Sequence, residues 1–498
     1  MGETVKRILD SVHGYIIVPD SCIKHIVDSE YFQRLRRIEQ TSGRSIFPSA
    51  RHDRFIHSLG VFHIGTQILE SFERRKQVDK DSLNYQRIAV SYEFACLLHD
   101  VGHTPFSHTF EDYYKNGYNK LDRRLKDLMN AYDSEFDKDF ENQIKEAAPH
   151  EKISAIVSIE VFGQFVNQQH QEPMYPVNGD IGLVARMIVG CKYLSNGHDL
   201  ENVFIELMHS KTIDADGLDY VCRDAWASGY RTSQVDMQRL IDAIMIKETE
   251  GKMNVCFSVK AINEIRSVIF VKNFQQDNVI THRTVVYEQE LLKKAMESAA
   301  IYYWELSETD DEDLRKSALE NLCSIDSYFN GIKTKRDKLQ IRLPMDDDFI
   351  YLMKTSQGNH YANEWMSRNY VLKPLWKSRE RFMSYFIKFK HELFNESCWL
   401  FSNHCKKYIS EKFNIDINQI WVVKALPKNK MASLKDLLLL VKDNVMPYTA
   451  LYPKETLLTT CLLPHFCYIF IPPRNRDGEV LDFTEIQAAV RQQFMELK

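Results

Sequence analysis

The chain has 498 residues, of which 44% are hydrophobic and 12% aromatic, and its formal net charge is −5. This composition excludes a disordered chain and describes an ordinary globular protein of several domains with a substantial core. The slight acidic excess also excludes a general positive field, so we do not expect nucleic acid as a partner, and an anionic ligand must be held by a local cluster of residues.

The cysteines and the apolar runs indicate the cellular compartment of the protein. The ten cysteines are scattered without a CxxC pair, which argues against a zinc ribbon and against a disulfide framework. The N-terminal residues contain no apolar signal core, and the longest apolar runs are far shorter than a membrane span. We therefore expect a soluble, cytoplasmic protein that has reduced thiols and no membrane contact.

Amphipathic helices are predicted to dominate the first 230 residues. Their apolar side chains recur every three or four positions, which is the spacing of one helix face. The predicted helices span residues 21–39, 54–72, 83–100, 148–162 and 212–230. The segment 112–148 is polar and highly charged, and we interpret it as an insertion or a mobile lid.

The second half of the chain predicts a change of architecture. A strand pair near residues 253–265 precedes further helices, and after about residue 393 strand and helix signals alternate. We therefore predict a mainly α fold in three parts. These are a core over residues 1–300 that contains the insertion, a helical extension over residues 301–393, and a small α/β module over residues 394–498.

A dense group of histidines lies at the end of the helix predicted for residues 83–100, in the run FACLLHDVGHTPFSH. His99 and Asp100 are adjacent, and His103 and His108 follow within nine residues. A lone histidine is more often a hydrogen-bonded core residue than a ligand, but this grouping favours metal binding or proton transfer. His57 lies in line with the buried stripe of its own helix and must find a polar partner there.

A polar helix face supplies a further carboxylate. Asp216, Tyr220 and Asp224 are spaced i, i+4 and i+8, so they share one face, although a solvated acidic face explains this spacing as well. The candidate metal ligands are His57, His99, Asp100 and Asp216. Imidazoles combined with carboxylates suit divalent Fe, Mn, Zn or Ni and leave positions open for water and substrate oxygens.

A cation of this kind indicates a reaction class. It polarises phosphoryl oxygens and lowers the pKa of bound water, which makes hydrolysis of a phosphate ester the natural reaction. The reaction also needs a proton donor for the leaving oxygen and positive charge for the phosphate. The residues available near the same helix ends are His103, His108, His150 and Arg54.

Four separated motifs, in this order, resemble one known family. They are RHDRFIHSLGV, LLHDVGHTPFSH, His150-Glu151 and IDADGLDYVCRD. They resemble the HD-domain phosphohydrolases, and specifically the dNTP triphosphohydrolases, over roughly residues 5–300. The resemblance implies a helical HD-domain core that binds a divalent metal through the four candidate ligands. It also implies hydrolysis of a dNTP, with Mg accompanying the substrate, to the deoxynucleoside and inorganic triphosphate.

The same matching implies roles for individual residues. His108 resembles the catalytic histidine at the α-phosphate, with help from His103 and Glu111, while His150 and Arg54 resemble residues that contact phosphate. The positions that match the pocket for the deoxyribose 3′-hydroxyl are Gln40, Tyr220 and Asp224.

The sequence departs from the family pattern around the substrate. Gly217 stands where the vertebrate enzymes have a phosphate-binding lysine. The triphosphate is therefore bound by fewer residues, or by residues elsewhere in the chain. Thr41 replaces a leucine beside the sugar, and Glu111 replaces an aspartate. The aromatic residue that screens the ribose 2′ position falls at Val286 or Tyr287. A phosphohydrolase acting on an NTP, a dNMP or a cyclic nucleotide is therefore an alternative, as is a catalytically silent nucleotide sensor.

A weaker resemblance concerns regulation. The segment DSEYFQRLRRI resembles the part of regulated relatives that binds an activating nucleotide between subunits, with Asp28, Gln33 and Arg36 as the matched residues. Arginine suits this task because its planar guanidinium binds phosphate with two donors, although an ordinary helix surface has the same composition. We expect a homo-oligomer with a dNTP substrate and an activating nucleotide.

Overall fold

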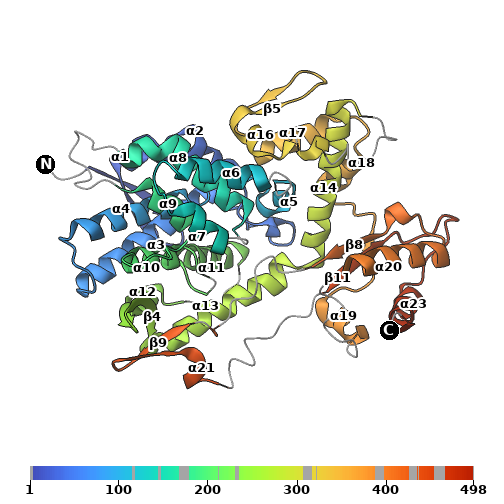
Figure 1. Cartoon of the computed structure of the whole chain (residues 1–498). Coiled ribbons are helices and arrows are strands. Elements are labelled where there is room, and N and C mark those ends of the chain that lie inside the picture. The colour runs from blue at the N-terminus through green and yellow to red at the C-terminus, as the bar shows by residue number, and fades with distance from the viewer. Residues whose placement is uncertain are drawn as a thin grey trace.

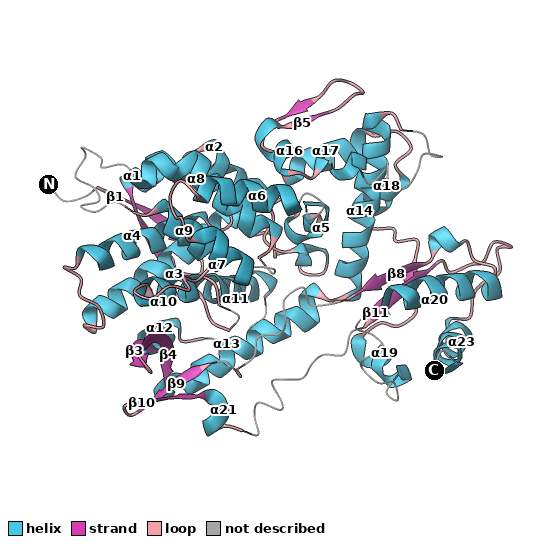
Figure 2. Ribbon diagram, in the orientation of Figure 1, coloured by secondary structure: helices cyan, strands magenta, loops and turns pink. Residues whose placement is uncertain are grey.

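The computed structural model describes most of the chain. The described residues are 4–114, 118–143, 147–167, 179–210, 212–229, 235–306, 317–320, 322–386, 398–425, 434–435, 437–453 and 466–496. Helices dominate them and the sheets are small, so the predicted mainly α fold is confirmed (Figures 1 and 2). Among the described helices, none combines the length and the hydropathy that a membrane crossing requires.

Six helices form the core that carries the histidine motifs. The side chain of Asp53 accepts a hydrogen bond from Ile56 N at 3.0 Å and so begins the central helix, α3. This helix packs against α4 and α11, while α4 and α8 both pack against α9. The six helices are α3 (Arg54–Arg74), α4 (Leu83–Leu98), α8 (Pro149–Asn167), α9 (Ile181–Val189), α10 (Asp199–Met208) and α11 (Ala215–Ser228).

The segment predicted as a mobile insertion or lid contains helices that belong to the core. After the short helix α5 (Glu111–Tyr114), α6 (Tyr118–Met129) packs against α8, and α7 (Phe136–Gln143) follows it. The apolar side chains of α6, namely Leu121, Leu125 and Met129, are at most 1% exposed. The apolar stripe of α6 among many charges is thus enough to bury one helix face, while a mobile insertion or lid over residues 112–148 stays a prediction.

The N-terminal segment differs from the single helix predicted over residues 21–39. A hairpin of β1 (Val5–Asp10) and β2 (Gly14–Pro19) leads into α1 (Asp20–Cys22), a π-helical turn, α2 (Glu30–Gln33) and a 3₁₀ turn. The break falls at Ser29, whose hydroxyl donates to Ile26 O at 2.6 Å and accepts from Phe32 N at 3.3 Å. This side chain therefore ends one turn and caps the next.

The C-terminal segment is divided between two sheets. Strand β9 (Leu438–Val441) pairs in parallel with β4 (Lys252–Ser258), which gives the sheet order β10-β9-β4-β3 with β10 (Asn444–Pro447) and β3 (Ile244–Thr249) at the edges. In Figure 1 these late strands, drawn in orange-red, return to the green strands of the core. Residues 394–498 therefore do not form one separate α/β module, because fully buried Leu439 and Tyr448 belong to the core of the first half.

The remaining elements lie beyond the long helix α14 (Arg283–Trp304), which follows α12 (Met237–Ala243) and α13 (Ile262–Gln275). The extension contains α16 (Ile325–Asn330), α17 (Asp346–Thr355) and α18 (His360–Ser367), with the strand pair β5 (Ile332–Lys333) and β6 (Gln340–Ile341). A second core surrounds the sheet β7-β11-β8. Its elements are β7 (Lys373–Pro374), α19 (Arg379–Phe386), α20 (Cys398–Phe413), β8 (Trp421–Lys424), β11 (Cys467–Ile471) and α23 (Phe483–Glu496), while α21 (Tyr448–Leu451) follows β10.

Candidate active site

Three of the four predicted metal ligands converge on one point. His57 lies on α3, His99 caps the C-terminus of α4, and Asp216 lies in the first turn of α11. The two Nε2 atoms are 3.3 Å apart, and Asp216 Oδ1 lies 3.0 Å from His57 Nε2 and 3.8 Å from His99 Nε2. The ligand atoms of this group all lie within 4.8 Å of one another, so the group could hold a metal ion.

Both imidazoles are oriented by the nitrogen that faces away from this point. His57 Nδ1 donates to Asp219 Oδ2 at 2.7 Å, and His99 Nδ1 donates to Cys96 O at 3.0 Å. With Nδ1 as the donor in each ring, the two Nε2 atoms point together and are the positions that would ligate a metal, as in histidines that ligate metals. The residues present therefore fit a divalent cation.

Asp100 adjoins the metal group without joining its closest set. Its Oδ2 lies 3.6 Å from both His57 Nε2 and His99 Nε2, and it accepts from Arg54 Nη1 at 2.5 Å. Its Oδ1 lies 3.8 Å from His103 Nε2. Asp100 therefore connects the metal group with the second histidine group.

Charge in the metal group favours a bound cation. Burial opposes protonation of His57, but Asp216 and Asp219 outweigh it and raise the pKa of this imidazole to about 10. Burial likewise opposes the Asp216 carboxylate, while the charge and hydrogen bond of His57 lower its pKa to about 2. The carboxylates thus make this position strongly attractive for a positive charge, which a divalent cation supplies better than a proton.

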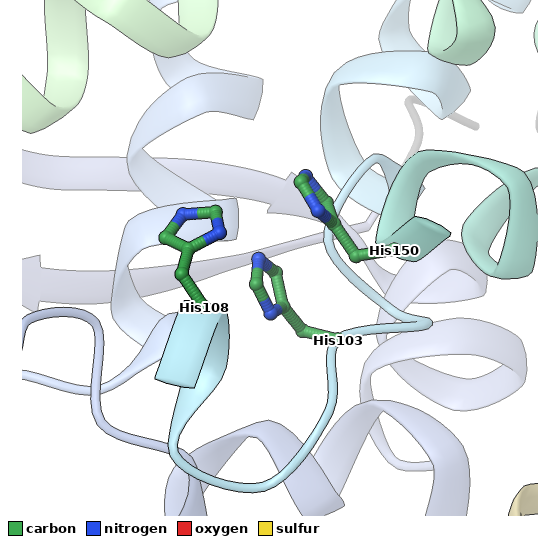
Figure 3. A group of neighbouring side chains, drawn as sticks. All are labelled: His103, His108 and His150. Carbon is green, nitrogen blue, oxygen red and sulfur yellow. The ribbon is translucent and has the colours of Figure 1, made fainter. Parts of the chain in front are cut away.

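The second group consists of the three other predicted histidines (Figure 3). His103 stacks on His150 with 4.2 Å between ring centroids, and His108 stands edge-on to both. Glu111 links them, because its two oxygens accept from His108 Nδ1 at 3.0 Å and from His150 Nδ1 at 2.5 Å. The sequence motifs therefore do bring together His103, His108, Glu111 and His150.

The environment separates the proton affinities of these histidines. Burial lowers the pKa of His150, but the Glu111 carboxylate outweighs it and raises the pKa above its ordinary value. Burial lowers the pKa of His108, which Glu111 only partly offsets, and holds the pKa of His103 far below its usual range. His103 is fully buried and neither ring nitrogen has a hydrogen-bond partner among the described residues. A neutral imidazole beside a charged one is suited to proton transfer.

The residues predicted to lie at the sugar are connected through one small cavity and its neighbours. Thr41 and Asp224 line the same small cavity together with Gln275 of α13. Asp224 Oδ1 accepts a hydrogen bond from His52 Nε2 at 2.6 Å, and Gln40 N donates to His52 O at 3.1 Å. His52 thus joins two of the predicted positions, Gln40 and Asp224. Tyr220 lies on the same helix as Asp224, one turn earlier.

Tyr287 does not lie in this cavity. Its side chain is 2% exposed within the second core, where its ring packs against Trp421 and Phe470 and its hydroxyl donates to Glu364. Val286 is buried in the same core. In this structure α14 directs Tyr287 toward the C-terminal sheet, so it lies in the second core, and its contact with the substrate stays a prediction.

A residue that the sequence reading missed supports the metal group. Asp219 Oδ1 accepts from His13 Nε2 at 2.6 Å, its Oδ2 holds His57, and Arg223 donates to both oxygens. The third carboxylate in IDADGLDY was the available signal. It could not be interpreted from spacing, because it lies on the buried side of α11 rather than on the predicted polar face.

The predicted regulatory residues lie together near the surface. Asp28 and Arg36 are exposed, Arg36 Nε donates to Gln33 Oε1 at 2.9 Å, and Gln33 Nε2 donates to Val27 O at 2.7 Å. The Arg36 guanidinium also lies 3.5 Å from the centroid of the Phe55 ring. These contacts hold the side chains in place, and their role in nucleotide binding stays a prediction.

Part of this chain is similar to known proteins with an HD domain. The HD domain model matches residues 54–170. The deoxynucleoside triphosphate triphosphohydrolase SAMHD1 of Homo sapiens is 26% identical over 298 residues, which is 56% of this chain and 42% of that protein. The uncharacterized protein YwfO of Bacillus subtilis is 31% identical over 253 residues, covering 49% of this chain and 47% of the relative. The chain spans about half the length of the curated relatives that it matches.

Solved structures agree in fold. A phosphohydrolase from Bacteroides thetaiotaomicron has a TM-score of 0.61 at 18% identity, with 94% of this chain and 99% of that chain covered. A hypothetical protein from Aquifex aeolicus has a TM-score of 0.59 at 19% identity, with 99% and 100% covered. The chain therefore carries an HD domain and is a distant homologue of the HD-domain deoxynucleoside triphosphate triphosphohydrolases.

Proposed function

We propose that this protein is a metal-dependent dNTP triphosphohydrolase, which releases a deoxynucleoside and inorganic triphosphate. The observation that carries the proposal is the pair of groups joined by Asp100. One is the convergent His57, His99 and Asp216, and the other is the histidine group around Glu111. Metal activation and proton transfer are the two requirements of phosphate-ester hydrolysis, and here they adjoin.

Each group has a distinct task in this proposal. His57, His99 and Asp216, with Asp100 beside them, would hold the cation, which polarises phosphoryl oxygens and favours deprotonation of water. Arg54 is buried and fixed by Asp100 and by Ser107 Oγ, which it contacts through Nε at 2.8 Å. Its positive charge is therefore held beside the position of the phosphate without reorganisation during the reaction.

In this proposal His108 supplies the proton that the leaving 5′ oxygen takes. A water oxygen bonds to the α-phosphorus, the bond from that phosphorus to the 5′ oxygen breaks, and the 5′ oxygen takes a proton as the nucleoside leaves. His108 is 46% exposed and paired with Glu111, so it can reach a substrate and regain a proton afterwards. His150 would support it by holding Glu111, and buried His103 by packing against both other rings.

Hydrolysis of NTPs is a second candidate function, and the position of Tyr287 and Val286 favours it. Because Tyr287 and Val286 are buried in the second core, neither can screen the ribose 2′ position. Hydrolysis of ribonucleoside triphosphates at the same site is therefore the main alternative to strict dNTP specificity.

We also propose that an activating nucleotide regulates this protein. The outer face of the N-terminal hairpin exposes Leu9, Tyr15 and Ile17, with exposed fractions of 70%, 61% and 51%, and the segment that contains Asp28 and Arg36 follows this hairpin in the sequence. An exposed apolar surface and a separate candidate anion site both support a homo-oligomer that binds an activating nucleotide between its subunits. Light scattering with and without added dNTP mixtures tests this part, and a monomer under all conditions contradicts it.

The activity test is a screen of all dNTPs and NTPs, singly and in pairs, with Mn, Mg or Fe and with metal analysis of the purified protein. Chromatography separates a deoxynucleoside and triphosphate from monophosphate or diphosphate products. His99→Ala should abolish turnover, while His404→Ala, which changes an exposed histidine far along the chain, should not. If no nucleotide releases triphosphate, the proposal is wrong, and if NTPs react as fast as dNTPs, the second candidate replaces it.

A further inference from the structure

A lysine from α13 reaches the N-terminal turn of α11, beside the candidate metal ligand Asp216. Helix α13 packs against α11, and Lys272 lies in its last turn. The ammonium nitrogen is 5.5 Å from the centroid of the Tyr220 ring and 3.5 Å from Thr212 O. The negative charges of Asp214 and Asp216 both act on it. The positive charge is thus placed at the end of α11 that carries the metal ligand.

No carboxylate neutralises Lys272 directly. Among the described residues, none forms an ion pair with its ammonium, and the oxygens of nearby Asp214 are already used. Asp214 Oδ1 accepts from Gly217 N at 2.7 Å, and Oδ2 accepts from Ser210 N at 2.9 Å. An ammonium offers three donors, of which one makes a long contact to Thr212 O and another hydrogen-bonds the Tyr220 side chain, so one donor is left for a ligand.

The arginines near the metal group are different. Arg54 is paired with Asp100 at 2.5 Å, and Arg223 is paired with Asp219 at 2.8 Å and with Asp10 at 2.9 Å. Their charges are balanced within the protein before any substrate arrives. Lys272 has no such direct ion pair among the described residues, and the carboxylates that act on its charge are Asp214 and Asp216.

Gly217 makes room for this arrangement. A Cβ atom at this position would lie 2.6 Å from Asp214 Oδ1 and 3.4 Å from Lys272 Nζ. At the first distance a side chain would force the Asp214 carboxylate, which accepts from Gly217 N, to shift, and the second distance places the ammonium next to the position of such a side chain. Residue 217 directly follows the metal ligand Asp216, whose charge acts on Lys272, so the ammonium lies at the helix turn that carries this ligand.

We propose that Lys272 binds the phosphate chain of the substrate and complements the charge of the metal ion. The identity of the ligand as a nucleoside triphosphate rests on the proposed function. A triphosphate carries more negative charge than one divalent cation balances, and a lysine on a flexible stem can follow the outer phosphates as a point charge. Lys272 is thereby a binding residue that favours nucleotides with a full phosphate chain.

The test measures binding of inorganic tripolyphosphate to the full-length, Mn-loaded protein by calorimetry. Removing one charged hydrogen-bond donor from phosphate should weaken binding by about 10- to 100-fold in Lys272→Met. Lys272→Arg, which keeps the charge, should stay within about threefold of the wild type. The matched control is Lys260→Met, which removes an exposed lysine that precedes the same helix and should change nothing. Thermal unfolding checks each variant, and Lys272→Gln replaces the methionine variant if that one does not fold.

The outcomes separate this proposal from the proposed function. If Lys272→Met binds tripolyphosphate as tightly as Lys260→Met, or if the wild type does not bind it, the assignment of Lys272 is overturned, whatever the activity. If tripolyphosphate binding depends on Lys272 while no dNTP is hydrolysed, the lysine assignment stands and the proposed function fails.

Discussion

The carboxyl group of Asp346 should make the stability of this protein depend on pH. Asp346 begins α17, is 5% exposed and accepts hydrogen bonds from Phe106 N at 2.6 Å and from Glu39 N at 3.0 Å. It therefore ties the extension to the loop that carries the second histidine group. That loop needs support, because Phe106 and Ser107 both have a positive φ, of 55° and 51°.

Burial raises the pKa of Asp346 to about 7. The charge of Glu39 also raises this pKa, whereas the two backbone hydrogen bonds and the charge of Arg34 lower it. In the unfolded chain the pKa is near 3.8. Folding therefore favours the protonated form, so this stability is fully present below about pH 4 and is lost as the pH rises through 7. Each pH unit in that range costs about 1.4 kcal/mol, which gives about 2 kcal/mol between pH 5.5 and pH 7.

The perturbation is Asp346→Asn, which cannot ionise. We expect the free energy of unfolding, from urea titrations at several pH values, to fall by about 2 kcal/mol more in the wild type than in this variant between pH 5.5 and pH 7. The asparagine keeps one acceptor oxygen, so a constant loss of about 1–3 kcal/mol at every pH is expected in addition. Asp347→Asn removes the exposed neighbouring carboxylate and should follow the wild type. Parallel pH curves for the wild type and Asp346→Asn would refute the reasoning.

Three other predictions test the structure. Asp219→Asn should weaken metal binding by about 10- to 100-fold, measured by calorimetry, because His57 loses the carboxylate that orients it, and unchanged affinity would contradict this role. Leu125→Ala should lower the free energy of unfolding by about 2–5 kcal/mol, measured with denaturant, whereas a residue of a detached lid would change it by much less. Tyr287→Phe should leave the ratio of dNTP to NTP turnover unchanged and should lower stability by about 1–3 kcal/mol, because Glu364 loses a donor; an altered ratio would return Tyr287 to the substrate site.

Local features of the fold could be read from the sequence alone. The helices predicted over residues 54–72 and 83–100 are found as Arg54–Arg74 and Leu83–Leu98, because apolar periodicity and end signals are local properties. The convergence of His57, His99 and Asp216 was predicted from motif chemistry. Each of these side chains is of a type that ligates metals and lies near the end of a predicted helix, so few positions other than a shared metal ion suit all three.

Tertiary structure decided the parts of the site that depend on distant segments. Asp219 and His57 are 162 positions apart in the chain, and Asp346 and Phe106 are 240 apart, so no local pattern pairs them. The buried stripe of α6 and the return of β9 to β4 likewise depend on which surfaces the rest of the chain leaves uncovered. The same holds for Tyr287. An aromatic residue on an amphipathic helix can face either a ligand or a core, and only the packing of α14 against the C-terminal sheet selects the core.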